Sequence, residues 1–431
     1  MTTDLLEQQP TGDRLALLYR LSQVFSSSLQ LDEVLNRVID ETLNALHGER
    51  GFVVLREPQG ALSFRAARGL DRETIESPQF QVSRGVVEQV ARSGLPVLTS
   101  DARSDDRFNM RRSVLDLGLR SILCVPLSLK ERVTGVVYID NRLRSGIFDQ
   151  DDLGLLSAIA SSAAIAIENA RLYQVAVDKG RMERELQVAR ELQAGLLPAA
   201  PPPLPGWELA ACWLPAREVA GDYYDLFPLA GGALALVIGD VCDKGMAAAL
   251  FMALSRSIVR ASLDAAPSPA EGLARANRLI HADAAEGMFV TLFCARLEPA
   301  SGTLTYVNAG HNPPLLVQGS GTGETLTSLA LTGMALGVLP DAPYEQCTLH
   351  LEPGDLLLCY TDGMTDARSA RGEAFGKDRL ERLARQHRPQ GVRRLVGAME
   401  QAVVAFSGGI APFDDVTLLA ARRMGSPGEG G

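Results

Sequence analysis

The chain has 431 residues, of which 46% are hydrophobic and 22% are charged, and its formal net charge is −10. This length predicts two or three domains, and the composition is that of a globular protein with full hydrophobic cores. The negative charge and the lack of any run of lysine and arginine argue against binding through a large basic surface. We therefore expect no nucleic acid partner.

Three features of the sequence favour a cytoplasmic location. The first residues, Met1 to Asp4, begin no signal-peptide pattern. The most apolar helical stretch, residues 153–167, is interrupted by Gly, Ser and Glu and is too short to span a bilayer, so we expect no membrane insertion. The six cysteines form no CxxC pair, and each lies in or beside an apolar run, as buried free thiols do. They are residues 124, 212, 242, 294, 347 and 359.

The first part of the chain alternates helices and short strands. Residues 1–29 form an N-terminal segment, with a frayed start and a helix at 13–25. A second helix begins with Asp32 as its N-cap and stops at Gly48. Strand patterns follow at 51–55, 62–67, 96–99, 121–127 and 133–140, with a helical piece at 86–91 and a closing helix from Asp151. This order predicts an α+β domain with an antiparallel sheet over residues 30–170.

This domain resembles a GAF domain. The resemblance rests on the element order, on residues 125–127 and 135–139, and on Asn141-Arg142 followed by Phe148 and Asp152. These last residues resemble a pattern of nucleotide-binding GAF domains, in which Lys stands at the position of Arg142. GAF domains are usually sensors, so the resemblance implies an unknown small-molecule or protein signal. A GAF fold used only for dimerisation is an equal alternative.

The closing helix continues through a linker at 171–198 and carries a heptad seam. Positions 165, 172, 179 and 186 hold Ile, Leu, Lys and Leu, and positions 168, 175, 182, 189 and 196 hold Glu, Val, Met, Ala and Leu. Such a pattern favours a parallel two-stranded coiled coil and hence a homodimer. The alternative is a single long helix packed on its own domain. Pro198 and the prolines at 201–203 end the helix.

Residues 199–423 form the second domain, and residues 424–431 are predicted to be a disordered tail. Its strands are predicted at 233–241, 290–297, 303–309, 355–361 and 416–421. Its helices are predicted at 246–263, 269–283, 377–387 and 390–406.

Four acidic motifs in this domain carry the chemistry. Asp240 and Asp362 end apolar runs, Asp414 precedes one, and Asp222 follows Gly221. If the strands concerned are neighbours, the side chains of Asp240, Asp362 and Asp414 converge at one edge of the sheet core. Hard divalent cations prefer oxygen ligands, and two close cations need several carboxylates. A single Asp in such a place is more often a turn former, but four together predict a two-metal hydrolase.

Several ordered motifs make residues 185–423 resemble a metal-dependent serine/threonine protein phosphatase of the PPM superfamily, in its bacterial RsbU/SpoIIE-like branch. They are ARELQAGLLP at 189–198, GDYYD at 221–225, GDV at 239–241, KG at 244–245, NAGHNPP at 308–314, YTDG at 360–363, GEAFG at 372–376 and DDVT at 414–417. The resemblance implies two layered antiparallel sheets flanked by helices. It also implies two Mn²⁺ or Mg²⁺ ions that activate a water for attack on phosphorus.

The same resemblance assigns the ligands. Asp240 corresponds to the bridging carboxylate, Asp362 and Asp414 to ligands of one ion, and Asp222 with the carbonyl of Val241 to ligands of the other. The branch has no general-acid histidine beside the bridging carboxylate, so protonation of the leaving group stays unassigned.

Other residues near the motifs have open roles. Asp243 stands where the family usually has Gly, and its side chain either perturbs the metal-side loop or, as we favour, points to solvent. His311 contacts substrate or, more often in such a turn, is structural. Asp225 either supports the metal ligands or acts as a cap or turn residue.

We expect a GAF-regulated, manganese-dependent protein phosphatase, and the family suggests a STAS-type anti-sigma-factor antagonist as its phosphorylated substrate. The GAF signal would pass along the helix at 165–197. The alternative is a non-catalytic sensor-scaffold whose phosphatase-like half only binds a partner. A third possibility is an enzyme acting on small phosphoesters.

Overall fold

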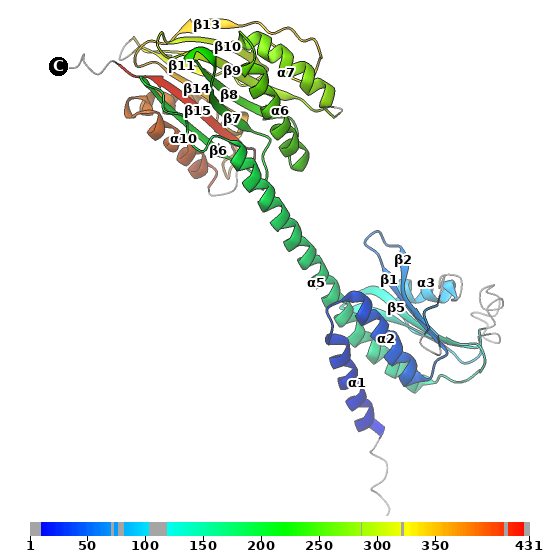
Figure 1. The fold of residues 1–431 in the computed structure, drawn as a ribbon. Coiled ribbons are helices and arrows are strands. Elements are labelled where there is room, and N and C mark those ends of the chain that lie inside the picture. Colours follow the sequence, from blue (N-terminus) through cyan, green and yellow to red (C-terminus); the bar gives the residue numbers. More distant parts are fainter. Residues whose placement is uncertain are drawn as a thin grey trace, which may run out of the picture. The chain divides into compact units, whose positions relative to one another are not determined.

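The computed structural model describes residues 10–69, 73–75, 82–102, 119–285, 287–319, 323–408 and 413–425 (Figure 1). The chain divides into two compact units, Met1–Met182 and Glu183–Gly431. The first nine residues and most of the predicted tail at 424–431 lie outside the described residues.

The first unit is an α+β domain with a five-stranded antiparallel sheet, as predicted. The strand order is β2-β1-β5-β4-β3. Its elements are α1 (Pro10–Ser26), α2 (Leu31–Leu46), β1 (Arg50–Arg56), β2 (Leu62–Arg68), α3 (Arg84–Ser93), β3 (Val97–Thr99), β4 (Ser121–Leu129) and β5 (Arg132–Asn141). The prediction of Asp32 as an N-cap was wrong, because Gln30 occupies that position and Asp32 lies in the first turn of α2.

Both faces of this sheet are covered (Figure 1). Apolar side chains of α1, α2 and the start of α5 (Gln150–Leu196) form one core against the sheet, and α3 forms a second core on the other face. The strands of this sheet therefore carry apolar residues on both of its faces.

Helix α5 is 47 residues long and spans the predicted linker. Four seam residues, Ile165, Leu172, Val175 and Met182, are between 55% and 64% exposed. These residues are not packed on their own domain, so the single-helix alternative does not account for the seam.

By length and composition alone, α5 and α6 (Met246–Asp264) could each cross a membrane. The apolar stretch at 153–167 lies within α5, so the helix that contains it is longer than the segment that the sequence argument considered. In the structure, however, many apolar side chains of both helices belong to the protein cores. The prediction of buried free thiols holds for Cys124, Cys294 and Cys359, whereas Cys212 and Cys242 are half-buried and Cys347 is exposed.

The second unit contains two five-stranded antiparallel sheets, with the orders β13-β10-β9-β8-β7 and β12-β11-β14-β15-β6. Its strands are β6 (Trp207–Leu214), β7 (Tyr223–Pro228), β8 (Leu234–Val241), β9 (Val290–Glu298), β10 (Thr303–Ala309), β11 (Leu315–Gln318), β12 (Thr325–Ser328), β13 (Cys347–His350), β14 (Leu356–Tyr360) and β15 (Val416–Arg423). Its helices besides α6 are α7 (Pro269–Asp283), α8 (Asp362–Asp366), α9 (Lys377–His387) and α10 (Val392–Phe406).

The two sheets are layered, as the resemblance implied. A core between them contains side chains of β8 and β9 on one side and of β14 and β15 on the other. Helices α6 and α7 cover the outer face of the first sheet, and α9 and α10 cover that of the second (Figure 1). Strands β14 and β15 are neighbours, whereas β8 lies in the other sheet, so the condition of neighbouring strands holds for Asp362 and Asp414 but not for Asp240. The acidic motifs meet across the layers instead.

Candidate metal centre

Asp240 lies at the end of β8, where an apolar strand reaches the edge of its sheet. Its partner across the ladder is Thr291 of β9. Burial, followed by the negative charge of Asp362, raises the pKa of Asp240 from 3.8 to about 7, and a hydrogen bond with Asp222 acts in the opposite direction. The Asp240 carboxyl thus lies in an acidic, water-poor environment.

Asp222 immediately precedes β7 and is almost completely buried. Two threonine hydroxyls of the other sheet donate to its Oδ2, Thr361 at 2.7 Å and Thr417 at 2.8 Å. Burial and the charges of Asp240 and Asp415 raise its pKa well above the ordinary value. These hydrogen bonds join the two sheets at the acidic cluster and fix the orientation of Asp222.

Asp362 and Asp414 come from the second sheet. Asp362 opens α8 directly after β14, and Asp414 lies two residues before β15. Burial and the charge of Asp414 raise the pKa of Asp362. The ammonium of Lys244 lies 2.7 Å from Oδ2 of Asp414 and 4.2 Å from the ring centre of Phe413. Lys244 therefore brings positive charge to the edge of the cluster.

Asp415 is a functional candidate that the sequence reasoning missed. Its carboxylate accepts hydrogen bonds from the backbone N–H groups of Ala216, at 2.7 Å, and Gly221, at 2.8 Å. It thereby holds the loop that leads into Asp222. The pair Asp414-Asp415 could have suggested this division of roles, but only the fold shows which of the two faces the loop.

Two glycines of the motifs allow the backbone to approach closely. A Cβ at Gly363 would lie 2.0 Å from the carbonyl oxygen of Asp415, which is a steric clash. A Cβ at Gly221 would lie 3.1 Å from the carbonyl oxygen of Val241, the predicted backbone ligand. The glycines therefore pack the Asp222 and Asp362 segments against the neighbouring motifs.

The donor atoms fit a pair of hard divalent cations. The predicted ligands are carboxylate and carbonyl oxygens, which Mg²⁺ and Mn²⁺ prefer. Among the residues that the structure describes, no three His, Cys, Asp or Glu side chains are gathered tightly enough to form a finished ligand set. Repulsion between like charges opposes a closer approach, and burial together with this repulsion raises the pKa of Asp240. Bound cations would favour the ionised carboxylates.

Asp225 has a structural role. Its carboxylate forms an ion pair with Arg256 at 3.0 Å and accepts hydrogen bonds from Arg260 at 3.1 Å, so it ties β7 to α6. Neither sequence-based role, as a support of the ligands or as a cap, describes this buried ion pair.

His311 is structural, the role that the sequence favoured. It is only 1% exposed, its Nδ1 lies 2.9 Å from the hydroxyl of Thr291, and burial lowers its pKa to about 4. Contact with a protein substrate is incompatible with this burial. Asp243 is exposed, as favoured, and its φ of 74° explains why the family usually has Gly there.

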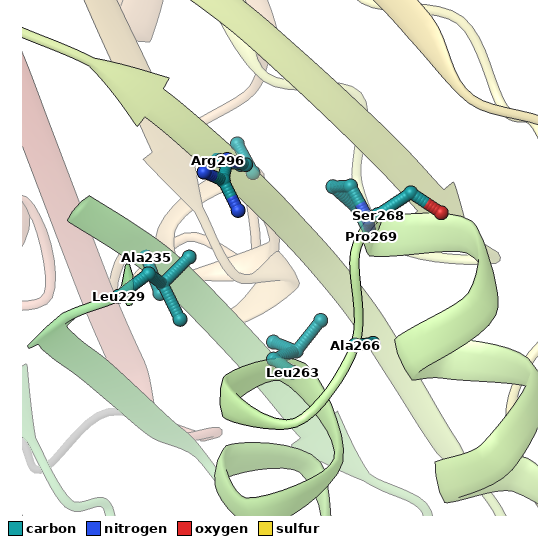
Figure 2. Close-up of a pocket in the computed structure, with 8 residues that line it drawn as sticks. Leu229, Ala235, Leu263, Ala266, Ser268, Pro269 and Arg296 are labelled. Carbon is teal, nitrogen blue, oxygen red and sulfur yellow. The ribbon is translucent and has the colours of Figure 1, made fainter. Parts of the chain in front are cut away.

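A small cavity lies between β8, β9 and the α6–α7 connection, apart from the acidic residues (Figure 2). Its volume is about 10 Å³, enough for about one water molecule. Leu229, Ala235, Leu263 and Arg296 line it, near the start of β8, whereas Asp240 lies near the end of that strand. The cavity is therefore not part of the acidic cluster.

The residues that resemble the pattern of nucleotide-binding GAF domains make local structural contacts in the first unit. Asn141 Oδ1 accepts from two backbone N–H groups of the following turn, and Arg142 pairs with Glu49 at 3.1 Å. Phe148 lies in the core, and Asp152 accepts from the N–H of Asp149 at the start of α5. These contacts give the pattern a structural role.

Two layered antiparallel sheets with flanking helices define a PP2C-type domain, and the first unit has the GAF architecture. Comparison with known families agrees: residues 230–424 match the family Stage II sporulation protein E (SpoIIE), and residues 28–168 match the GAF domain family. The chain thus combines a GAF domain with a SpoIIE domain of the PPM phosphatases. The SpoIIE match contains Asp240, Asp362 and Asp414, whereas Asp222 lies before it.

Two known proteins are similar to parts of this chain. The chain is 34% identical over 306 residues to protein IcfG of Synechocystis sp., a match that covers 64% of this chain and 46% of IcfG. The chain therefore spans about half the length of that relative. It is 29% identical over 246 residues to the phosphoserine phosphatase RsbU of Bacillus subtilis, covering 56% of this chain and 71% of RsbU.

A solved structure supports the fold. The SiaA-PP2C domain of Pseudomonas aeruginosa superimposes with a TM-score of 0.51 at 22% identity. The superposition covers 57% of this chain and 99% of that domain.

Proposed function

We propose that this chain is a metal-dependent phosphoserine and phosphothreonine protein phosphatase controlled by its GAF domain. The observation that carries the proposal is the convergence of acidic residues from four separate motifs, which come from two different sheets of a SpoIIE domain. The activity of the relative RsbU, a phosphoserine phosphatase, supports the same reaction.

In this proposal two Mn²⁺ or Mg²⁺ ions would be held by the carboxylates of Asp222, Asp240, Asp362 and Asp414 and by the carbonyl of Val241. When bound, such a pair supplies positive charge to the phosphoryl group and lowers the pKa of a shared water to near neutrality.

The residues of the chain prepare this site. Thr361 and Thr417 orient the Asp222 carboxylate, and Asp415 fixes the loop before it. Five aspartates in one cluster would repel a phosphate dianion, which needs the charge of bound cations to approach. Lys244 offsets only part of this negative charge. A phosphatase with these residues is therefore expected to depend strictly on divalent metal.

The proposed substrate is a phosphorylated STAS-type anti-sigma-factor antagonist in the cytoplasm. The proposed signal is a small molecule or protein that binds the GAF domain, and it passes to the phosphatase along α5. The exposed seam of α5 supports a homodimer through a parallel coiled coil, because apolar residues at heptad spacing bury one another in such a pair.

The experiment is release of phosphate from a phosphoserine STAS-domain protein by the full chain, with manganese or with a chelator. We expect metal-dependent release that is lost in Asp240→Asn and in Asp362→Asn, while circular dichroism shows a folded protein. Asp341→Asn, at an exposed site, is the matched control.

Wild-type rates in both Asp variants would refute the mechanism. Manganese binding without turnover would support the metal centre. It would also indicate that this substrate is wrong or that an activating signal is missing. Absence of both manganese binding and turnover would favour the non-catalytic scaffold. Faster turnover of small phosphoesters, which compete with the protein, would favour the third possibility.

A further inference from the structure

Lys244 belongs to the KG motif of the second unit, and the proposed metal centre gives it no contact with substrate. It lies in the turn between β8 and α6, after Asp240. Oδ1 of Asp243, a residue with a φ of 74°, accepts from the backbone N–H of Lys244 at 2.8 Å. From this hydrogen-bonded turn the Lys244 side chain reaches the segment before β15, a strand of the other sheet.

The Lys244 ammonium makes three contacts in that segment. It lies 2.7 Å from Oδ2 of Asp414, donates to the carbonyl of Phe413 at 3.0 Å, and lies 4.2 Å from the centre of the Phe413 ring. Since a cation is attracted to the face of an aromatic ring, two of these contacts depend on Phe413 alone. They hold the ammonium in place whether or not the Asp414 carboxylate keeps its full charge.

The ammonium lies where the acidic cluster meets solvent. The side chains of Lys244 and Asp414 are 30% and 32% exposed, and Phe413 is 72% exposed. Among the ion pairs of the residues that the structure describes, this one alone includes an aspartate of the cluster. The cluster consists of residues 222, 240, 362, 414 and 415. Lys244 therefore places a positive charge on the side from which an anionic ligand would enter.

Both carboxylate oxygens of Asp414 already have partners. Oδ1 accepts from the backbone N–H of Asp415 at 3.0 Å, and Oδ2 pairs with Lys244. If Asp414 binds a divalent cation, it has to share its carboxylate between that cation and the ammonium. Sharing neutralises part of the carboxylate charge, so the attraction between Asp414 and Lys244 weakens. A donor of the ammonium then becomes available to another anion.

We propose that Lys244 is a phosphoryl-binding residue, whose ammonium passes from Asp414 to a phosphoryl oxygen of the substrate. A phosphate monoester presents anionic oxygens, and a lysine ammonium binds such oxygens as a compact charge with three donors. This inference rests on the proposed function. It adds a residue that touches the substrate to the side chains that would hold the metal.

A purely structural role for Lys244 predicts a different result. In that role the side chain only anchors the turn after β8 to the segment before β15, so its loss would loosen Asp414 and weaken Mn²⁺ binding. In the proposed role Lys244 competes with the cation for Asp414. Its loss would then leave Mn²⁺ binding as tight as in the wild type or tighter, and only phosphate binding would weaken.

The test compares Lys244→Met, which keeps the length of the side chain and removes its charge, with Lys244→Arg, which keeps the charge. Lys377→Met is the matched control, because it removes the ammonium of an exposed ion pair with Glu381 in α9. Titration calorimetry of the full chain measures the affinity for Mn²⁺. A second titration measures the affinity of the manganese-loaded chain for inorganic phosphate, and neither readout requires turnover.

We expect Lys244→Met to bind inorganic phosphate about 10-fold more weakly, as for the loss of one hydrogen bond to a charged group. Its Mn²⁺ affinity should be unchanged or up to about 5-fold higher, because a partly exposed ion pair is weak. Lys244→Arg should keep the phosphate affinity within about threefold of the wild type. Lys377→Met should match the wild type in both titrations. Lys244→Gln takes the place of the Met variant if that variant does not fold.

Wild-type phosphate affinity in Lys244→Met would overturn the inference, as would a loss of Mn²⁺ affinity that accounts for the weaker phosphate binding. A wild-type chain that binds manganese but no phosphate would also overturn it, while the metal centre would stand. A wild-type chain that binds no manganese would overturn the proposed function and the inference with it. The STAS-domain protein takes no part in these titrations, so a wrong choice of protein substrate does not affect their result.

Discussion

Asp240→Asn should stabilise the metal-free protein while abolishing metal-dependent turnover. The Asp240 carboxyl is buried beside Asp362 and Asp222, and its pKa is raised from 3.8 to about 7. A carboxyl with a raised pKa in the folded state binds its proton more tightly when folded, so stability falls as pH rises from about 4 to about 7. Above pH 7 the folded protein carries the full free-energy cost of the ionised Asp240, and a neutral Asn removes this cost.

The magnitude follows from the two pKa values. The difference between 3.8 and about 7 corresponds to about 4 kcal/mol at about 1.4 kcal/mol per tenfold change in proton affinity. Protonation of the neighbouring carboxyls relieves part of the repulsion on Asp240. We therefore expect about half of this free energy, roughly 2 kcal/mol, as the stabilisation by Asp240→Asn. For a unit of this size that corresponds to a rise in Tm of about 4–8 °C.

Differential scanning calorimetry at pH 8 with a chelator measures this effect on the transition of the second unit. Asp341→Asn, at an exposed position, should leave the Tm within about 1 °C. Manganese should then raise the Tm of the wild type more than that of Asp240→Asn. A metal-free Asp240→Asn variant that melts at or below the wild-type temperature would refute the cost assigned to burial and like charge at Asp240.

Three further results are expected. Asp225→Ala should cost about 3–5 kcal/mol in urea unfolding, because it leaves the buried Arg256 without its carboxylate, and it should leave Mn²⁺ affinity unchanged. Burial lowers the pKa of His311 from 6.5 to about 4, so the unfolded chain takes up the proton first as the pH falls. The stability that neutral His311 contributes, about 3 kcal/mol, is therefore complete above pH 6.5 and is lost as the pH falls toward 4. Urea unfolding of wild type and His311→Asn between pH 7 and 4 measures this difference in slope. Gly363→Ala should cost about 1–3 kcal/mol and weaken Mn²⁺ binding in calorimetry, because its Cβ would lie 2.0 Å from the Asp415 carbonyl.

Each of these expectations has a contradicting outcome. Loss of Mn²⁺ affinity in folded Asp225→Ala would return that residue to the metal centre. Equal pH slopes for wild type and His311→Asn would mean that another group controls the acid range. Gly397→Ala is the control for Gly363→Ala, since no atom lies within 4 Å of the added Cβ in α10. Similar stability of the two Ala variants would contradict the close approach at Gly363.

Local sequence patterns predicted many elements well. The predicted helices at 269–283 and 377–387 coincide with α7 and α9, because their apolar periodicity and their helix-start signals agree. The short strands β11, β12 and β13 and the edge strands β6 and β7 were not predicted. Strand β6 is mostly half-buried, so its apolar alternation is weak, whereas β7 is buried but only six residues long.

The candidate ligands were accessible from the sequence because each lies in a recognisable motif, but their supporting residues were not. Thr361 and Thr417 bond to Asp222 over separations of 139 and 195 residues. Asp225 could not be assigned to Arg256, nor Asp415 to Gly221, from spacing alone.

The sequence by itself determined the order and class of the two domains, the positions of most regular elements and the four acidic motifs. These depend on local chain chemistry, namely periodicity, turn residues and short motifs. Only the tertiary structure decided that the acidic motifs meet across two sheets, which carboxylate holds a loop, and which aspartate pairs with Lys244. Those relations depend on how distant segments pack, because a hydrogen bond between residues far apart in the chain leaves no periodic mark in a single sequence.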